Sequence, residues 1–219
     1  DEGSGYTYDG PRAKRLTAEQ FTDLFWSLTG TAPLAFDAPV VRGISDPATE
    51  ARLERSSSWI WGPSATKGLV AGGEKVLLRR DFKPSKPVRS AGLVVSVDNG
   101  FTVYLNNQLV FTGTDWTKLS SAPIDVKKGE NQLLLVAENG TTSPNPAGAF
   151  AAIRIVYEDG SDEVIATDDS WTVSTKVPAG NKPGQWKIAE MTWEKAVPLP
   201  SGPWSATIDP QVGKSLAAA

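Results

Sequence analysis

The feature of this sequence that most constrains its fold is a series of short β-rich segments between residues 59 and 175. These segments, which include KVLLRRDF, FTVYLN and NQLLLVAEN, are separated by Gly, Asn, Asp or Pro at intervals of roughly 8 to 15 residues. No helix-length periodicity interrupts the series, which disfavours a parallel α/β sheet. Short strands with regular turn signals are typical of all-β sandwiches and barrels. We therefore predict an all-β fold for this region.

The segments on either side of the β-rich region have different patterns. Apolar side chains recur at helical spacing from Phe21 to Leu28, and Thr17 is a good N-cap, so residues 17–29 are predicted to form a helix. The C-terminal flank is rich in Pro and Gly and predicts irregular structure. The predicted organisation is an N-terminal arm (1–58), a β-sandwich (59–175), a loop-rich tail packing on the rest (176–214) and a tag remnant (215–219).

Composition excludes several classes of site and partner. The chain has no Cys and no His, which excludes disulfides, Cys/His zinc sites and Ser-His-Asp triads within it. The net charge is −3 and the Lys and Arg residues are scattered, so no basic footprint for nucleic acid is present. No apolar run approaches the roughly 18 residues of a membrane span, so no membrane insertion is expected.

Strand order predicts which loops share one end of the sandwich. If consecutive strands run antiparallel, the longer and more polar loops meet at one end, which we call the upper pole. The other end carries short turns, such as the one at Asn106 and Asn107. The acidic pair Asp168 and Asp169 is also predicted at the upper pole. The candidate ligand-binding residues there are Trp61, Asp98, Asn99, Phe101, Asp115, Trp116, Glu138, Asn139 and Asn145.

The residue types at the upper pole suit a carbohydrate. Asn and Asp side chains supply the paired donors and acceptors that sugar hydroxyls require, and Trp rings stack on the C–H faces of sugars. Long loops on a rigid scaffold are also where binding residues concentrate. The oxygen ligands at this pole would suit calcium as well, although no EF-hand spacing occurs. No cofactor other than calcium is expected, and no residue is assigned as a metal ligand.

Each of these candidates also has a structural interpretation. Asp98, Asn99 and Gly100 have the composition of an ordinary hairpin turn. Trp116 follows an Asp at a strand end and could be a core residue. Asn139 could cap its own loop backbone. Trp61 alternates with Trp59 along one strand, so that one ring could face the core and the other the solvent.

The order of several motifs adds a family resemblance. The motifs are WIW, DNGFTVYLNNQLV, the Trp after TD, KGENQLLLVAEN, NPAG and ATDDSW, in that order within residues 59–175. This region resembles the galactose-binding-like jelly rolls of α-L-rhamnosidase accessory domains and related carbohydrate-binding modules. The resemblance implies a galactose-binding-like jelly-roll β-sandwich and carbohydrate as its partner. In the rhamnosidase-type domain the turn at Asn106-Asn107 is usually Asn-Gly, and Asn also adopts positive φ.

The N-terminal arm carries a second resemblance. Its segment RAKRLTAEQFTDLFWSLTGTAP, followed by FDAPVVRG, is similar to part of large multidomain planctomycete proteins that contain cytochrome-c-like domains. This resemblance implies an extracytoplasmic location, periplasmic, secreted or at the cell surface, and other domains of the same parent chain as partners. A haem site is not implied, because no C-x-x-C-H motif is present.

The leading hypothesis is a non-catalytic carbohydrate-binding module. A structural module that positions neighbouring domains is the main alternative. A carbohydrate-active enzyme would need two carboxylates, for which Asp98, Glu138 and Asp168 are available. Shallow loops would not raise the pKa of such a group as a deep cleft does, which argues against an enzyme. We therefore assign no catalytic residue.

Overall fold

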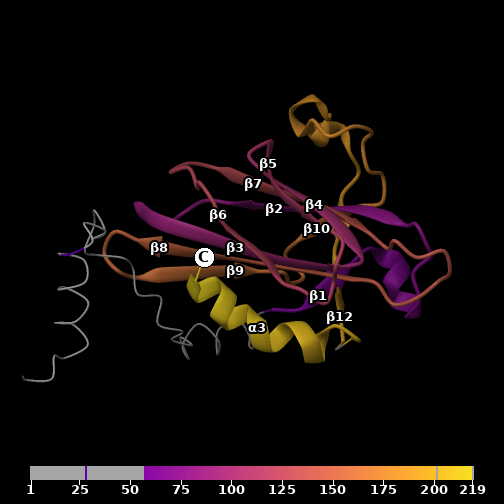
Figure 1. Ribbon diagram of the computed structural model, residues 1–219. Helices are drawn as coiled ribbons and strands as arrows, with labels where there is room; N and C mark the ends of the chain where they lie inside the picture. The colour runs from indigo at the N-terminus through magenta and orange to yellow at the C-terminus, as the bar shows by residue number, and fades with distance from the viewer. Residues whose placement is uncertain (1–27, 29–56, 201, 219) are drawn as a thin grey trace, which may run out of the picture. The chain divides into compact units, whose positions relative to one another are not determined.

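The computed structural model describes Leu28, residues 57–200 and residues 202–218 (Figure 1). The predicted N-terminal arm and its helix over residues 17–29 therefore lie outside the described residues, apart from Leu28, Ser57 and Ser58. None of the helices in the part of the chain described is long and apolar enough to span a membrane.

The β-rich region forms two antiparallel sheets of six strands each (Figure 1). Sheet 1 has the order β12–β1–β8–β3–β6, and β9 also pairs with β8; its strands are β1 (Trp59–Trp61), β3 (Val88–Asp98), β6 (Ser120–Pro123), β8 (Gly148–Tyr157), β9 (Asp162–Ala166) and β12 (Val197–Leu199). Sheet 2 has the order β11–β10–β2–β7–β4–β5; its strands are β2 (Lys75–Phe82), β4 (Gly100–Leu105), β5 (Gln108–Gly113), β7 (Asn131–Glu138), β10 (Thr172–Ser174) and β11 (Glu194–Lys195). The predicted all-β sandwich is thus confirmed.

The alternation of side chains along each strand determines the core. In β7, Leu133 and Leu135 are fully buried in the main core cluster, while Leu134 belongs to a separate cluster on the outer face of sheet 2. Trp61 and Trp171 are also fully buried in the main cluster. This period of two places one set of apolar residues between the sheets and leaves the other set to be covered from outside.

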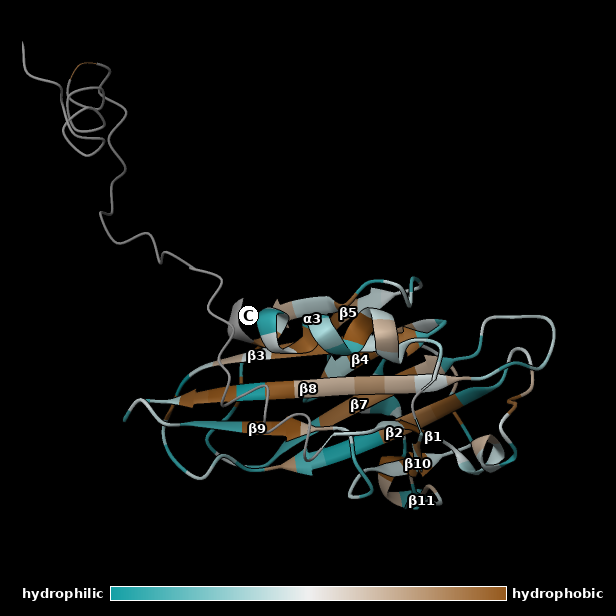
Figure 2. Cartoon of the chain, turned by 90° about the horizontal axis from the view of Figure 1, so that it is seen from below, coloured by the Kyte–Doolittle hydropathy of each residue, from teal (hydrophilic) through white to brown (hydrophobic). Residues whose placement is uncertain are grey.

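A C-terminal helix covers the outer face of sheet 1. Helix α3 (Ser205–Ala218) lies against β3 and β8 (Figure 2), and Ile208, Val212 and Leu216 follow Trp204 at intervals of one turn. These residues are buried in a second cluster with Trp59, Val94 and Phe150. The prediction of a loop-rich tail is therefore wrong for residues 205–214. Pro203 and Pro210 masked the apolar i, i+4 spacing in the sequence.

The end of α3 also contributes to the packing. The helix continues through residues 215–218, which the sequence analysis assigned to a tag remnant. Leu216 is only 1% exposed in the second cluster.

The segment between β10 and β11 packs on the outer face of sheet 2. It contains the short 3-10 helices η2 (Pro183–Gln185) and η3 (Ile188–Glu190), whereas η1 (Pro63–Lys67) follows β1. Trp186 and Trp193 of this segment belong to a cluster with Leu77 and Tyr104 of the sheet. We call residues 176–193 the covering segment.

Two tight turns with similar composition have different roles. Asn106 and Asn107 close the β4–β5 hairpin with φ values of 51° and 68°, as predicted. Asp98, Asn99 and Gly100 do not form the expected hairpin turn, because β3 belongs to sheet 1 and β4 to sheet 2. This connection instead carries the chain from one sheet to the other at the upper pole.

Candidate functional site

Strand register places several predicted residues at one end of the sandwich. Asp98, the last residue of β3, pairs with Gly148 at the start of β8. Glu138, the last residue of β7, lies between Lys75 and Gly100, which begin β2 and β4. The connection through Asn99 therefore joins this end of both sheets, which is the upper pole.

Asp98 is the most unusual residue of this pole. It is 5% exposed, and its Oδ1 atom is buried without a hydrogen-bond partner in the described part of the chain. Desolvation by burial raises the pKa of this carboxyl from 3.8 to about 6. A buried acceptor without a donor is unfavourable, and such groups concentrate at binding and catalytic sites.

Asn99 is held by contacts to the neighbouring loop. Its Oδ1 accepts a hydrogen bond from the Gly140 backbone N–H at 2.9 Å, and its own backbone N–H donates to the Glu138 carbonyl at 2.8 Å. The Nδ2 group has no hydrogen bond with the residues described. The side chain is half-exposed, so this amide remains available to a ligand.

The residues after Asn99 in the predicted set have mainly structural contacts. Asn139 is fully buried, and its Nδ2 donates to the Val70 and Ala71 carbonyls at 3.1 Å each. It therefore caps a different loop from its own. Asn145 pairs with Val70 through the backbone, and its Oδ1 accepts a hydrogen bond from Thr141 at 3.1 Å. These two residues tie the loops of the pole together.

Three other candidates are engaged within the protein. Trp61 is 0% exposed and its Nε1 donates to Glu74 at 3.0 Å. Phe101 is buried and packs edge-on against Phe111, with ring centroids 5.8 Å apart. Neither ring presents a face to a ligand in this conformation. Glu138 is half-exposed and forms an ion pair of 2.9 Å with Lys75.

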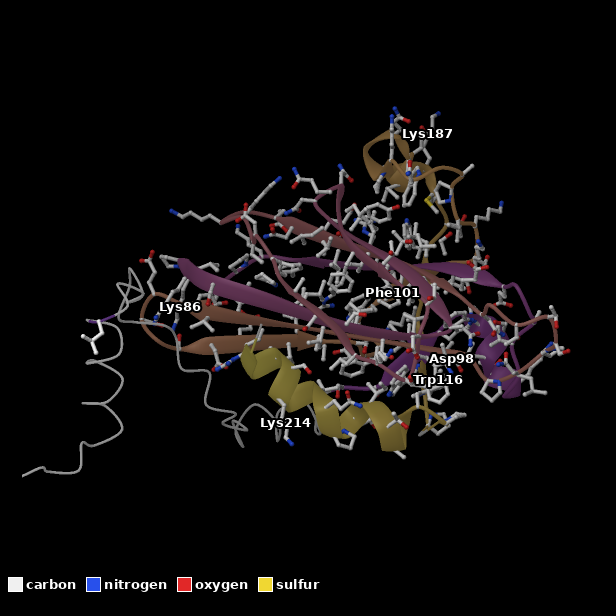
Figure 3. All side chains as sticks on the ribbon, in the orientation of Figure 1. Lys86, Asp98, Phe101, Trp116, Lys187 and Lys214 are labelled. Atoms are coloured by element: carbon white, nitrogen blue, oxygen red, sulfur yellow. The ribbon has the colours of Figure 1, made fainter. Side chains whose placement is uncertain are left out.

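The loop between β5 and β6 brings Trp116 to the same pole. Its carbonyl accepts a hydrogen bond from Ser96, two residues before Asp98 on β3, at 3.3 Å. Trp116 is half-buried and packs against the cluster beneath α3. Figure 3 shows Trp116 and Asp98 at the same end of the sandwich.

Asp115 is used within its own loop. Its Oδ1 accepts hydrogen bonds from the Thr117 backbone and hydroxyl, and its Oδ2 pairs with Lys118 at 3.0 Å. The hydrogen bond from the Thr117 side chain, followed by that from Lys118, lowers the pKa of this carboxyl. Asp115 thus shapes the turn that carries Trp116.

Trp204 was not among the predicted site residues, and it lies against Gly148, the cross-strand partner of Asp98. A Cβ atom on Gly148, the cross-strand partner of Asp98, would lie only 2.5 Å from Cζ2 of Trp204. The Trp204 ring thus covers Gly148, and its buried Nε1 has no partner among the described residues. An unsatisfied donor and an unsatisfied acceptor therefore flank one glycine. The only sequence signal was a Trp preceded by Gly and Pro.

A depression of about 520 Å³ adjoins this arrangement. It lies between the loop before β8, strand β12 and the start of α3. Ala147, which lines it, precedes Gly148 in the chain. The described residues that line it are mainly apolar and include Pro146, Leu199, Pro203 and Trp204.

Asp168 lies on the connection between β9 and β10. The chain crosses between sheets after β9, and Thr172 of β10 then pairs with Arg79, whereas Glu138 pairs with Lys75 at the start of β2. The Asp168 Oδ1 accepts hydrogen bonds from the backbone and hydroxyl of Ser170.

No group of three or more acidic side chains that could hold a metal ion occurs among the described residues. A cation at the upper pole would therefore depend on Asp98 together with amide and backbone carbonyl oxygens, which are ligands that Ca²⁺ accepts.

Comparisons with known proteins relate the sandwich to sugar-binding structures. No protein-family model and no curated protein matches the sequence. The apo form of a Pleurotus ostreatus lectin is 29% identical with a TM-score of 0.60, covering 69% of this chain and 44% of the lectin chain. A Pleurotus ostreatus lectin in complex with GalNAc is 28% identical with a TM-score of 0.59, covering 69% and 45%.

An enzyme shares the fold over a smaller part of its length. Streptomyces avermitilis α-L-rhamnosidase, solved with L-rhamnose, is 24% identical with a TM-score of 0.58, and the match covers 69% of this chain but 15% of the enzyme. The chain thus spans less than half of the lectin and a small part of the rhamnosidase. It contains a lectin-like β-sandwich that resembles a lectin solved in complex with GalNAc.

Proposed function

We propose that this chain is a non-catalytic carbohydrate-binding module that holds a neutral sugar at the upper pole, on a galactose-binding-like jelly roll. The observation that carries the proposal is the buried, unpartnered Oδ1 of Asp98 beside the free amide of Asn99. The likeness to the Pleurotus ostreatus lectin, which was solved with GalNAc, supports the ligand class.

The site offers each type of contact that a sugar uses. Asp98 accepts hydrogen bonds from hydroxyl groups, and a charged acceptor makes them stronger than a neutral one. Asn99 Nδ2 and Trp204 Nε1 supply donors. The exposed part of the Trp116 ring supplies an apolar face for sugar C–H groups. Calcium, if present, would bind through Asp98 and neighbouring oxygen atoms.

Isothermal titration calorimetry with GalNAc, L-rhamnose and a panel of neutral polysaccharides tests this proposal. In Asp98→Asn, binding should weaken by about tenfold or more, because a hydrogen bond to a charged group contributes roughly 1.5–3 kcal/mol. Asp125→Asn is the matched control, since that carboxyl is exposed and follows β6, which runs away from the Asp98 end of β3. Titrations with EDTA and with added calcium separate direct binding from binding through the ion. A folded protein that binds none of these glycans would rule the proposal out.

A structural module between domains is the alternative function. The burial of Trp61 and Trp171 favours it, because these rings stabilise the sandwich and are not free to bind. The calorimetric titrations distinguish the two functions, since a purely structural module would give no heat of binding with any of these glycans.

The cellular location and the neighbouring domains of this chain are proposed from its sequence alone. The comparisons give no support to a planctomycete cytochrome-type parent chain. We propose an extracytoplasmic location and covalent neighbours in a longer chain because of the resemblance of the N-terminal arm. Fractionation of native cells followed by immunoblotting would test both, since it reports the compartment and the mass of the parent protein.

A further inference from the structure

The outer face of sheet 2 carries two depressions that share a wall. One is about 390 Å³ and is lined by residues that include Arg79 and Asp81, and the other is about 280 Å³ and is lined by residues that include Trp186. Asn107 and Gln132 line both of them. We call this combined depression the outer groove. Lys187, labelled in Figure 3, lies on the covering segment and also lines the groove.

The floor of the groove follows from strand alternation. Asp81 of β2 pairs directly with Gln132 of β7, and the Gln132 Nε2 group donates to Asp81 Oδ1 at 3.0 Å. Arg79, two residues earlier on the same face, donates to the other oxygen of Asp81. The covering segment packs on the apolar residues of this face, such as Leu77 and Leu134, and its Trp193 lies over Arg79, whereas Asp81 is exposed.

The walls bring together the hairpin turn and the covering segment. A Cβ atom on Gly184 would lie 3.8 Å from Asn107 Nδ2, so the two segments approach each other closely. The Asn107 amide makes no hydrogen bond within the described residues. Its backbone has a φ of 68°, and the half-exposed Trp186 ring packs edge-on against Tyr104.

Two buried donors lie unsatisfied around the groove. Arg79 Nε and Trp186 Nε1 have no hydrogen-bond partner among the described residues. The guanidinium of Arg79 lies 5.3 Å from the centre of the Trp193 ring, which restricts its orientation. Buried N–H groups without acceptors are rare because each is unfavourable, so acceptor atoms supplied by a ligand would stabilise this region.

The charges of the groove identify the ligand class. Three cations are matched by three anions, so the groove has no formal net charge and gives no attraction to phosphate or to a polyanion. Amide groups and an indole instead favour a ligand with many hydroxyls. The charged residues are Arg79, Lys127, Lys187, Asp81, Glu130 and Glu190.

We infer that the outer groove is a second carbohydrate-binding site, which takes a linear neutral oligosaccharide with consecutive rings in the two depressions. The groove lies at the β4–β5 turn, whereas the upper pole lies at the other end of β4, where Gly100 pairs with Glu138. The two sites share no residue, so this inference does not depend on ligand binding at Asp98.

The test uses nuclear magnetic resonance of the full chain with cellohexaose, maltohexaose and galactan oligosaccharides as probes. The indole N–H signal of Trp186, assigned from its loss in Trp186→Phe, reports the groove. The Gly140 backbone N–H, which donates to Asn99, reports the upper pole. At least one probe should shift the Trp186 signal in a saturable manner.

Variants that remove single amides make the test specific. Asn107→Gly keeps the turn, because glycine accepts a φ of 68°. Combined with Gln132→Ala, it should raise the dissociation constant measured at Trp186 by about tenfold, since two ligand hydrogen bonds are lost. Gln211→Ala removes an exposed amide from α3 and is the matched control. Thermal unfolding of each variant verifies that it is folded.

The outcomes separate the two sites. A Trp186 shift that persists in Asp98→Asn supports the outer groove whatever happens at the upper pole. The inference is overturned if no probe moves the Trp186 signal, or if Asn107→Gly with Gln132→Ala leaves its dissociation constant unchanged. A shift at Gly140 alone would also overturn it and would leave the proposed function standing.

Discussion

At the scale of single residues, Asp98 couples the stability of the fold to pH. Its pKa rises from 3.8 to about 6 because burial disfavours the charged form, with no compensating donor to its Oδ1. Between these values the folded state binds more protons than the unfolded state. Stability therefore decreases as pH rises from about 4 to about 6, and the full penalty is present above that window.

Asp98→Asn is expected to stabilise the protein at neutral pH. The neutral amide avoids a penalty that corresponds to at most roughly 3 kcal/mol, at about 1.4 kcal/mol for each step of one in pKa. The gain over wild type should shrink as pH falls through this window and disappear well below the unfolded-state pKa of 3.8, where the wild-type carboxyl is protonated in both states. Thermal unfolding of both proteins across this range measures the effect. A variant that is less stable than wild type at neutral pH would contradict this expectation.

Gly148→Ala should disturb the upper pole, because the added Cβ would lie 2.5 Å from the Trp204 ring. Overpacking of this kind destabilises a protein by roughly 1–3 kcal/mol. Displacement of Trp204 should also change the intrinsic fluorescence. Gly129→Ala is the control, since a Cβ there meets no atom within 4 Å. Equal unfolding midpoints for the two variants would show that the ring can move without loss.

At the scale of elements, the sequence predicted strands better than their connections. Alternation in segments such as β7 predicted a sandwich, because period-two burial is a local property. The predicted antiparallel order of consecutive strands was correct for the β4–β5 hairpin, which stays within one sheet. After β9 the chain changes sheets, and local turn chemistry does not reveal such a crossing. The same limitation made Asp98-Asn99-Gly100 resemble a hairpin.

Helix α3 was missed for a different reason. Pro210 lies inside it, and Pro203 and Gly202 precede it, so that local propensity argued for a loop. Tertiary packing outweighs that propensity, since Trp204, Ile208 and Leu216 are buried against sheet 1. Because this tail was predicted to be irregular, Trp204 was not included among the candidate site residues.

Ile208→Ala is expected to destabilise the protein by roughly 2–4 kcal/mol, because Ile208 is fully buried between α3 and sheet 1. Thr207→Ala, at an exposed neighbouring position, is the matched control and should have a small effect. Chemical denaturation measures both free energies of unfolding. If the two variants were equally stable, the packing of α3 on the sandwich would contribute little.

At the scale of the whole described region, the two proposed sites lie at opposite ends of β4, so binding to a polymer would be bivalent if both were occupied. When one site engages a polysaccharide, the second binding event becomes intramolecular and gains effective concentration. One polysaccharide chain, or two neighbouring chains, would then occupy the upper pole and the outer groove together.

Avidity is the measurable consequence of two sites. Wild type should bind an immobilised neutral polysaccharide at least about tenfold more tightly than either Asp98→Asn or Asn107→Gly with Gln132→Ala. The gain should vanish for short soluble oligosaccharides, which cannot reach both ends. Surface plasmon resonance on glycan-coated chips compares the three proteins. Additive losses of equal size on polymer and oligosaccharide would argue that the sites act separately.

The passage of the chain from sheet 1 to sheet 2 at Asn99 has a mechanical consequence. Asn99 is hydrogen-bonded to both the Glu138 carbonyl and the Gly140 backbone N–H, so a sugar bound by Asn99 would be attached where the two sheets are joined. Tension applied through a bound polymer would be shared by β3 and β4 from the outset. Such a force would act along the strands and load many backbone hydrogen bonds at once. This end of the sandwich would therefore resist mechanical unfolding.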